Sequence, residues 1–389
     1  MRRIYLDHGA TTPPDPRVVD KMLTYLRGTF GNPSSGHVFG REAREGIEKA
    51  RVRVARGLGA DPREIVFTSG GSEANYLALR GAAYANRERG RHIVASQIEH
   101  HSVLDTCRDL EREGFEVSWV PVDEWGLVDP GDVAAVLRPT TILVSVMLAN
   151  NEVGTIQPVG EIAALARTAG ALCHTDAVQG FGKMAVNVRE LGVDLLSISA
   201  HKIYGPKGAG ALYLRNGTNW RPLNYGGGQE WGCRPGTENV AGIAGLGMAA
   251  ELAVAELETE AARVGALRDR LVEQVLLRVP GARLTGHRER RIPHNAHFLI
   301  AGVAGFELLA GLDAEGVAVS AASACAAGSG APSHVLQAMG IPNELALGAV
   351  RVTLGRGNTA EEVDRFVDSL ERLVGEIRSR KAGHKPPQG

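Results

Sequence analysis

Short apolar segments alternate with helical segments through the first two thirds of the chain, and this alternation constrains the fold more than any other feature. The apolar runs 64–69, 92–96 and 141–147 each precede a stretch with helical periodicity. The third of these helical stretches has Pro158 near its start and Gly170 after its end, and these residue types are common at the start and just past the end of a helix. Strand–helix alternation of this kind predicts an α/β fold in which helices cover both faces of a mainly parallel sheet.

The last third of the chain has a different organisation. Residues 240–279 form a long Ala/Leu/Glu-rich helical stretch, which we expect to connect two domains. Residues 281–380 mix strand segments (NAHFLI, RVTL) with helices, and the final helix has one apolar face made by Val363, Phe366, Val367, Leu370, Leu373, Val374 and Ile377. We predict a large domain over residues 15–256, a smaller α+β domain built from residues 1–14 and 257–380, and a disordered tail over 381–389.

Composition limits the classes of partner. The net charge of −1 provides no general attraction to nucleic acid or to an anionic membrane. No apolar stretch approaches the roughly 18 residues that span a bilayer, and the N-terminal sequence lacks the apolar core of a signal peptide. The four cysteines lie far apart without a CxxC pair. We therefore expect a cytoplasmic protein that binds neither nucleic acid nor membrane, and we expect no metal site.

Polar residues at the predicted strand ends suggest a cofactor site, because α/β sheets bind ligands beyond the carboxyl ends of their strands. Gly71 and Ser72 lie at a strand-to-helix turn that favours phosphate. Asp176 follows one strand and Lys202 another. A pyridoxal phosphate enzyme needs such a turn, a lysine that forms a Schiff base and an acid that keeps the pyridine nitrogen protonated. His100, which opens a helix, could stack on the ring and pass protons.

Each of these residues also has a plainer interpretation when taken alone. The glycine-rich turn could simply reverse the chain, a lysine at a strand end is usually solvated, and a histidine at a helix start usually bonds to the helix terminus. The combination favours the cofactor site.

Ten motifs in order make the chain similar to the NifS/IscS-type cysteine desulfurases. They are YLDHGATTP, GNPSSGH, FTSGGSEAN, EHHSVLDTCRDLEREGFEV, NNEVGTIQP, HTDAVQ, SAHKIYGPKGAGALY, GGGQE with RPGTEN, SACAAGS with PSHVLQAMG, and RVTLGRGNT. The resemblance covers residues 3–375. It implies a pyridoxal phosphate enzyme of the class V aminotransferase group with fold-type I architecture, in which a large domain with a mainly parallel seven-stranded sheet accompanies a smaller α+β domain.

The resemblance also implies a role for individual residues. Lys202 would be the Schiff-base lysine, Asp176 would pair with the pyridine nitrogen, Gln179 would contact the ring hydroxylate and His100 would stack above the ring. The phosphate ligands would be Gly71, Ser72, Ser199 and His201, with Thr237 contributed by a second subunit of a homodimer. Asn151 and Arg351 would bind the substrate carboxylate, although from the sequence alone Asn151 reads as a turn residue and Arg351 as half of a surface salt bridge.

Cys325 decides which reaction such a site performs. It lies in a segment rich in glycine, alanine and serine, which predicts a mobile, exposed loop. As a thiolate it would take the sulfur of L-cysteine, release L-alanine and hold a persulfide for an acceptor such as an iron–sulfur scaffold or a thio-cofactor pathway. Cys107 and Cys173 have the setting of core residues, and we expect Cys233 to be incidental.

Other interpretations remain open. A selenocysteine lyase or another class V pyridoxal phosphate enzyme would use the same lysine, although an aminotransferase would not need Cys325. A nucleotide-binding oxidoreductase is disfavoured because GLGMAA (245–250) follows no strand. A non-catalytic sulfur relay would have no use for Lys202. The chain departs from its relatives at Gly9, Trp231 and Ala322, and its short tail leaves scaffold recognition open.

Overall fold

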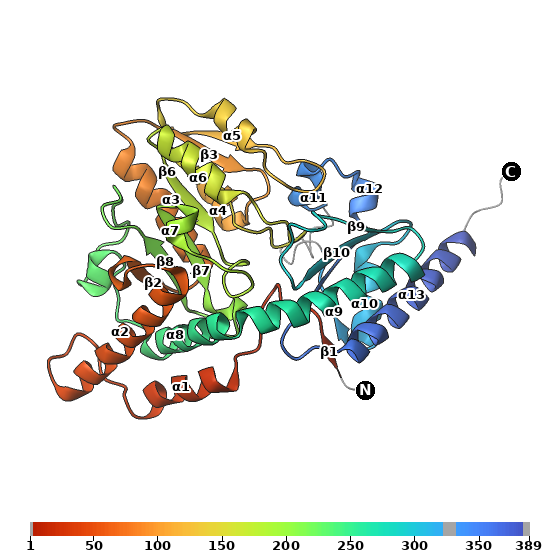
Figure 1. Cartoon of the computed structure of the whole chain (residues 1–389), viewed down its shortest axis with the longest axis horizontal. Coiled ribbons are helices and arrows are strands. Elements are labelled where there is room, and N and C mark those ends of the chain that lie inside the picture. The colour runs from red at the N-terminus through yellow and green to blue at the C-terminus, as the bar shows by residue number, and fades with distance from the viewer. Residues whose placement is uncertain (1–2, 322–331, 384–389) are drawn as a thin grey trace.

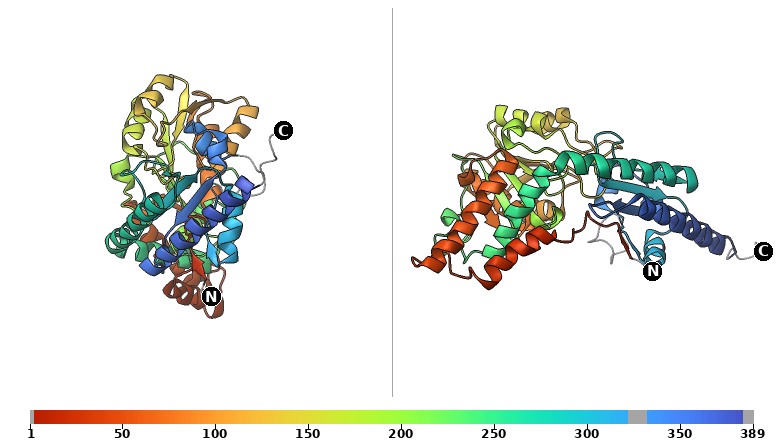
Figure 2. Two further views of the ribbon diagram at one scale, coloured as in Figure 1. Left: turned by 90° about the vertical axis from the view of Figure 1, so that its right-hand side faces the viewer. Right: turned by 60° about the horizontal axis from the view of Figure 1, so that its bottom comes forward.

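The computed structural model describes residues 3–321 and 332–383. The chain forms two lobes joined by long helices, and a large twisted sheet lies at the centre of the first lobe (Figure 1). The first and last described elements, β1 (Ile4–Tyr5) and α13 (Ala360–Gly383), both belong to the second lobe (Figure 2).

The central sheet has seven strands and is mainly parallel, as the alternation of segments predicts. Its order is β2-β8-β7-β6-β5-β3-β4, and only β8 runs antiparallel to its neighbours. The strands are β2 (Ile65–Thr68), β3 (His92–Ser96), β4 (Glu116–Val120), β5 (Thr141–Ser145), β6 (Leu172–Asp176), β7 (Leu195–Ser199) and β8 (Gly210–Leu214). The inner strands β3, β5 and β7 are buried along their whole length, which explains why the sequence shows them as continuous apolar runs.

Helices cover both faces of this sheet and form a separate apolar core on each. One core contains side chains of α3 (Gly71–Asn86) and α4 (His101–Arg112). The other contains side chains of α2 (Val38–Leu58), α5 (Pro130–Val136), α6 (Val159–Thr168), α7 (Val188–Leu191) and α8 (Val240–Ala255). The remaining elements of this lobe are α1 (Pro16–Arg27), which packs beside α8, and the short helices η1 (Pro62–Glu64), η2 (Ala200–Lys202) and η3 (Gln229–Gly232).

The second lobe has a smaller antiparallel sheet of order β12-β10-β9. Its strands are β9 (Ala282–Leu284), β10 (Asn295–Ile300) and β12 (Ala349–Thr353), and its helices are α9 (Leu257–Arg278), α10 (Gly305–Ala314), α11 (His334–Ala338), α12 (Asn343–Ala346) and α13. The predicted apolar face of α13 is buried in this core. β1 pairs in parallel with β11 (Val317–Ala318), so the N-terminal strand joins the second lobe.

The long helical stretch predicted over 240–279 is two helices rather than one. The axes of α8 and α9 meet at 73°. Glu256 lies at the break with non-helical backbone angles, and its carboxylate pairs with Arg17 at 2.7 Å and with Arg356 at 3.0 Å. Contacts to distant segments therefore fix the bend, which a local helical pattern does not reveal.

The tail begins later than predicted. Helix α13 continues to Gly383, so residues 381–383 are helical, and Lys381 pairs with Glu307 of α10 at 3.5 Å. Residues 384–389 lie outside the described part of the chain. The domain boundaries themselves remain a prediction, although the bend at Glu256 coincides with one of them.

No single helix among residues 3–321 and 332–383 is long and apolar enough to cross a membrane, and only the bent pair α8 and α9 would qualify together. GLGMAA lies inside α8, where no strand precedes it directly, so the structural setting of a dinucleotide fingerprint is missing there.

Candidate active site

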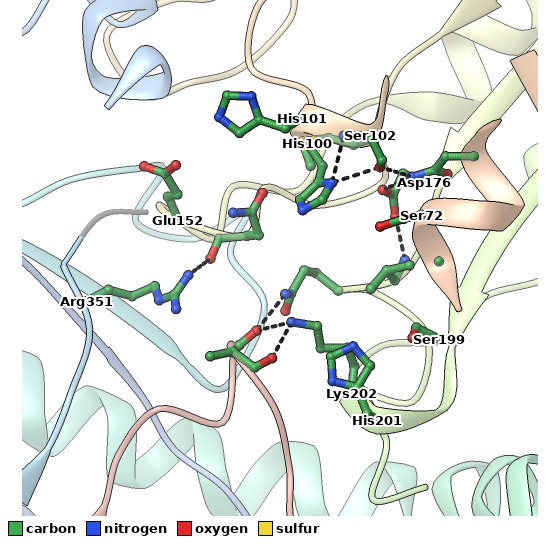
Figure 3. Close-up of a pocket in the computed structure, with 18 of the residues that line it drawn as sticks. Ser72, His100, His101, Ser102, Glu152, Asp176, Ser199, His201, Lys202 and Arg351 are labelled. Atoms are coloured by element: carbon green, nitrogen blue, oxygen red, sulfur yellow. Dashed lines mark hydrogen bonds between the residues drawn. The ribbon is translucent and has the colours of Figure 1, made fainter. Parts of the chain in front are cut away.

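A cavity of about 270 Å³ lies beyond the carboxyl ends of the central strands, where the second lobe closes over them (Figure 3). It brings together ten residues that the sequence singled out, although they come from distant segments. The cavity is lined by Gly71, Ser72, His100, Asn151, Asp176, Gln179, Ser199, His201, Lys202 and Arg351.

The start of α3 forms an anion-binding corner of the cavity. Its N-cap residue, Gly70, has no side chain to accept from the N–H groups of the first turn. A side chain at Gly71 would place its Cβ 2.6 Å from Val178 Cγ2, so only glycine lets the helix start approach this wall so closely. The free N–H groups, the helix dipole and the hydroxyls of Ser72 and Ser199 suit a phosphate group.

His201 borders the same corner as a neutral imidazole. Burial, together with the neighbouring charge of Lys202, lowers its pKa to about 4. Its Nδ1 lies 3.2 Å from the hydroxyl of Thr11. It can therefore donate a hydrogen bond at neutral pH without adding charge.

Asp176 is a buried carboxylate that the protein holds by two hydrogen bonds. It ends β6, and its Oδ2 accepts from Asn75 Nδ2 at 2.7 Å while its Oδ1 accepts from the backbone N–H of Val178 at 2.9 Å. Sequence reasoning missed Asn75. Its position one helical turn after Ser72 was the available signal, since residues three apart share a helix face.

His100 is held in one tautomer at the start of α4. Its Nδ1 accepts from the backbone N–H of Ser102 at 3.1 Å and lies 2.8 Å from the Ser102 hydroxyl, so the ring proton belongs on Nε2 (Figure 3). Burial lowers the pKa of His100, while the carboxylate of Asp176 acts in the opposite direction. The imidazole is therefore neutral at neutral pH and can donate from Nε2.

Lys202 points into the cavity from η2. Its Nζ donates to the carbonyl oxygens of Gly9 at 2.6 Å and Ala10 at 2.8 Å (Figure 3). The carbonyl of Gly9 also accepts from Gln179 Nε2 at 3.0 Å. The N-terminal segment thus forms the floor beneath the lysine, an arrangement the sequence did not predict.

Arg351 is a buried arginine rather than half of a surface salt bridge, and its protein partners do not use all of its N–H donors. It is 3% exposed, and it donates to the carbonyl of Asn151 and to Asp7 Oδ1, each at 3.0 Å. Its Nε and the amide oxygen Oδ1 of Asn151 are buried with no partner among the described residues. Arg351 lines the cavity, and its unpartnered N–H donor suits a ligand that carries a carboxylate.

Further polar residues line or support the cavity without having been predicted. Burial raises the pKa of Glu152, which lines the cavity, to about 7, and that of Glu99 behind it to about 8. His101 and His334 also line the cavity, and their rings lie 4.9 Å apart. Glu99, His101 and Glu152 are sequence neighbours of predicted site residues, and only this proximity could have indicated them. The strand-end pattern does not predict that a carboxyl group is buried.

The structure does not place Thr237 in this cavity. Thr237 is exposed in a segment where Glu230 and Trp231 both have positive φ angles. That backbone is held by Arg51, which pairs with Glu230 at 2.8 Å and lies over the Trp231 ring at 4.3 Å. Cys233 in the same segment is half-buried.

Two of the remaining three cysteines are buried, and the third lies outside the described residues. Cys107 and Cys173 are buried core residues, as predicted, and burial raises the pKa of both thiols. Cys325 and Ala322 lie outside the described residues. Within residues 3–321 and 332–383, no cluster of three histidine, cysteine or acidic side chains could hold a metal ion.

Comparison with known proteins gives a consistent result. The family model described as aminotransferase class-V matches residues 4–366. Cysteine desulfurase IscS of Dictyoglomus turgidum is 50% identical over 97% of this chain and 96% of its own length, and that of Methanosarcina thermophila is 47% identical over 97% and 93%. A solved structure titled NifS-like protein has a TM-score of 0.91 at 40% identity, covering 96% of this chain and 100% of that one. The resemblance and the α/β fold expected from the motifs are confirmed.

Proposed function

Because the chain belongs to the class V aminotransferase family and, within it, to the cysteine desulfurases of the IscS type, we propose that it removes sulfur from L-cysteine with pyridoxal phosphate as cofactor. The products are L-alanine and a persulfide on Cys325. The observation that carries the proposal is the meeting, in one cavity, of an uncapped helix start, a buried aspartate and a lysine.

The described residues fit the cofactor. The start of α3 with Ser72, Ser199 and His201 would hold its phosphate, Asp176 would keep its pyridine nitrogen protonated, and Gln179 would contact its ring hydroxyl. When bound, pyridoxal phosphate supplies an aldehyde for the amine and a ring that accepts the electron pair of a bond broken at the substrate α-carbon.

The substrate carboxylate would bind at Arg351 and Asn151. The unpartnered Nε of Arg351 and its remaining N–H groups can form a fork that matches a carboxylate. The amide nitrogen of Asn151 adds a donor beside it. An anchored carboxylate would fix the substrate in the same cavity that Lys202 lines.

Two residues would move protons. Lys202 takes the α-proton at Nζ, where two backbone carbonyls accept from its N–H groups. His100, neutral and protonated at Nε2, donates a proton from the opposite side of the cavity and can take it back from the substrate thiol. Because the lysine and the histidine belong to different elements, each can be held in place independently.

Cys325 would act as the nucleophile in its thiolate form. Its sulfur would form a bond to the substrate sulfur while the carbon–sulfur bond of the substrate breaks. The electron pair of the broken bond would remain with the substrate carbon. Protonation then yields L-alanine. The persulfide left on Cys325 passes its outer sulfur to an acceptor, which we propose to be a protein such as an iron–sulfur scaffold.

The cavity would be completed by a second subunit. Thr237 is exposed on its own chain and would reach the phosphate corner of a partner in a homodimer. Mixing Lys202→Ala chains with Thr237→Ala chains tests this, because a hybrid dimer contains one site free of both substitutions. Recovery of about a quarter of the wild-type activity in random mixtures supports the shared site, whereas recovery of none contradicts it.

Selenocysteine is the second candidate substrate, since it differs from cysteine only in having selenium in place of sulfur and would fit the same carboxylate site. The relatives named cysteine desulfurase favour cysteine. Alanine release from each amino acid by the purified holoenzyme, beside Lys202→Ala as the inactive control, tests the assignment. The proposal requires release from L-cysteine that depends on Lys202, and release from L-selenocysteine alone would contradict it.

A further inference from the structure

The floor beneath Lys202 is a short N-terminal stretch that is itself fixed from the second lobe. The carbonyls of Gly9 and Ala10 each accept a hydrogen bond from the lysine amine, at 2.6 and 2.8 Å. Gly9 belongs to no helix or strand, so its own carbonyl position depends on side contacts. One of these contacts is a hydrogen bond donated by the backbone N–H of Gly9.

That contact comes from Thr353, the last residue of β12. Its hydroxyl oxygen accepts the Gly9 N–H at 2.7 Å, although the two residues are 344 positions apart. The backbone reinforces the pairing, because Thr353 N–H donates to the Leu6 carbonyl at 2.8 Å and His8 N–H donates to the Thr353 carbonyl at 3.2 Å. Thr353 is fully buried.

The two residues also touch. A Cβ built on Gly9 would lie 3.0 Å from the methyl carbon Cγ2 of Thr353 and 3.2 Å from its hydroxyl oxygen. Gly9 therefore packs directly against the threonine side chain, and the hydroxyl and methyl groups together define where the glycine lies. Thr353 does not line the cavity, so it has no contact of its own with a bound substrate.

A precisely held carbonyl matters because of what Lys202 has to do. When the amine takes the α-proton it becomes an ammonium group inside a cavity, and a buried ammonium is costly without acceptors. The two carbonyls provide them, and hydrogen bonds to a charged group are stronger than neutral ones. A shift of the carbonyls by a fraction of an ångström weakens these bonds and displaces the base from the α-carbon.

We propose that Thr353 is a positioning residue for Lys202, acting through the backbone of Gly9. The inference rests on the proposed function of Lys202 as the base. It gives the second lobe an indirect influence on the proton transfer, in addition to the proposed contact of Arg351, two residues earlier on β12, with the substrate carboxylate.

The test compares Thr353→Val, which keeps the shape and removes the hydroxyl, with Thr353→Ser, which keeps the hydroxyl and removes the methyl. The assay follows exchange of the α-proton of L-alanine for deuterium in heavy water by NMR, using the holoenzyme. In this step the α C–H bond breaks, the proton goes to Lys202 Nζ and solvent deuterium returns. We expect the valine variant to exchange about five- to tenfold more slowly at saturation, with its KM for L-alanine unchanged, and the serine variant to match the wild type.

Each outcome decides something different. Equal exchange rates for wild type and Thr353→Val would overturn the inference alone, as would an equal loss in Thr353→Ser, which would indicate packing rather than the hydroxyl. No exchange by the wild type would overturn the proposed role of Lys202 and the inference with it. If Thr353→Val does not fold, Gly9→Ala disturbs the same contact from the other side, and an unchanged exchange rate there would overturn the inference.

Discussion

Replacing Arg351 by lysine tests the proposed carboxylate site quantitatively. Arg351 already donates from Nη1 to the Asn151 carbonyl and from Nη2 to Asp7 Oδ1, each at 3.0 Å, and still has N–H groups for a substrate. Lysine keeps the charge but has a single nitrogen in place of the planar guanidinium fork, so it cannot bind a carboxylate bidentately. We expect the loss of one charge-assisted hydrogen bond to the substrate, about 1.5–3 kcal/mol, or about 10- to 150-fold in affinity.

The loss should appear in KM, because the carboxylate contact is the same in the ground state and the transition state. The assay measures alanine release from L-cysteine and from L-cysteine methyl ester, which has no carboxylate charge. Arg283→Lys, on β9 of the same sheet but exposed, is the matched control and should change neither substrate. A fall in kcat at unchanged KM, or an equal rise in KM for the ester, would refute the reasoning.

Two further predictions concern buried ionisable side chains. Glu230→Gln breaks the ion pair with Arg51, in which each side chain is 3% exposed, and should lower the free energy of unfolding by about 3–5 kcal/mol; urea denaturation that finds no more loss than in the exposed control Glu45→Gln would contradict this. Burial raises the pKa of Glu99 to about 8 from 4.5, so between these values the folded state binds more protons than the unfolded state and stability falls as pH rises. Glu99→Gln should remove this contribution, about 1.4 kcal/mol per pH unit between pH 5 and 8, and parallel stability curves for the two proteins would contradict it.

Local sequence patterns predicted the central sheet and its helices, because apolar runs, helical periodicity and flanking proline or glycine indicate each element within its own segment. The runs that became β2, β3 and β5 are apolar since both faces of the sheet are covered. The strand-end pattern predicted that Gly71, Ser72, Asp176 and Lys202 lie together, because parallel strands bring their carboxyl ends to one edge of the sheet. The positions of Asn151 and Arg351 in the cavity were expected only from the family resemblance.

Interactions between distant segments could not be predicted in this way. Asp7 and Arg351 are 344 positions apart, and nothing near either residue indicates that they pair. The bend between α8 and α9 likewise depends on ion pairs of Glu256 with α1 and with the segment after β12. Glu99 reads as an ordinary charged residue in the sequence, and only the packing around it reveals a buried carboxyl group.

The central claim is that Cys325 receives the sulfur that Lys202 and the cofactor make labile. The most direct test measures alanine released from L-cysteine by the purified wild type and by Cys325→Ser, with the absorbance of the bound cofactor recorded for both. The proposed mechanism predicts that both proteins bind the cofactor and that only the wild type releases alanine. Equal release by both proteins would contradict it, because the sulfur would then leave to another thiol such as Cys233 or to the added reductant.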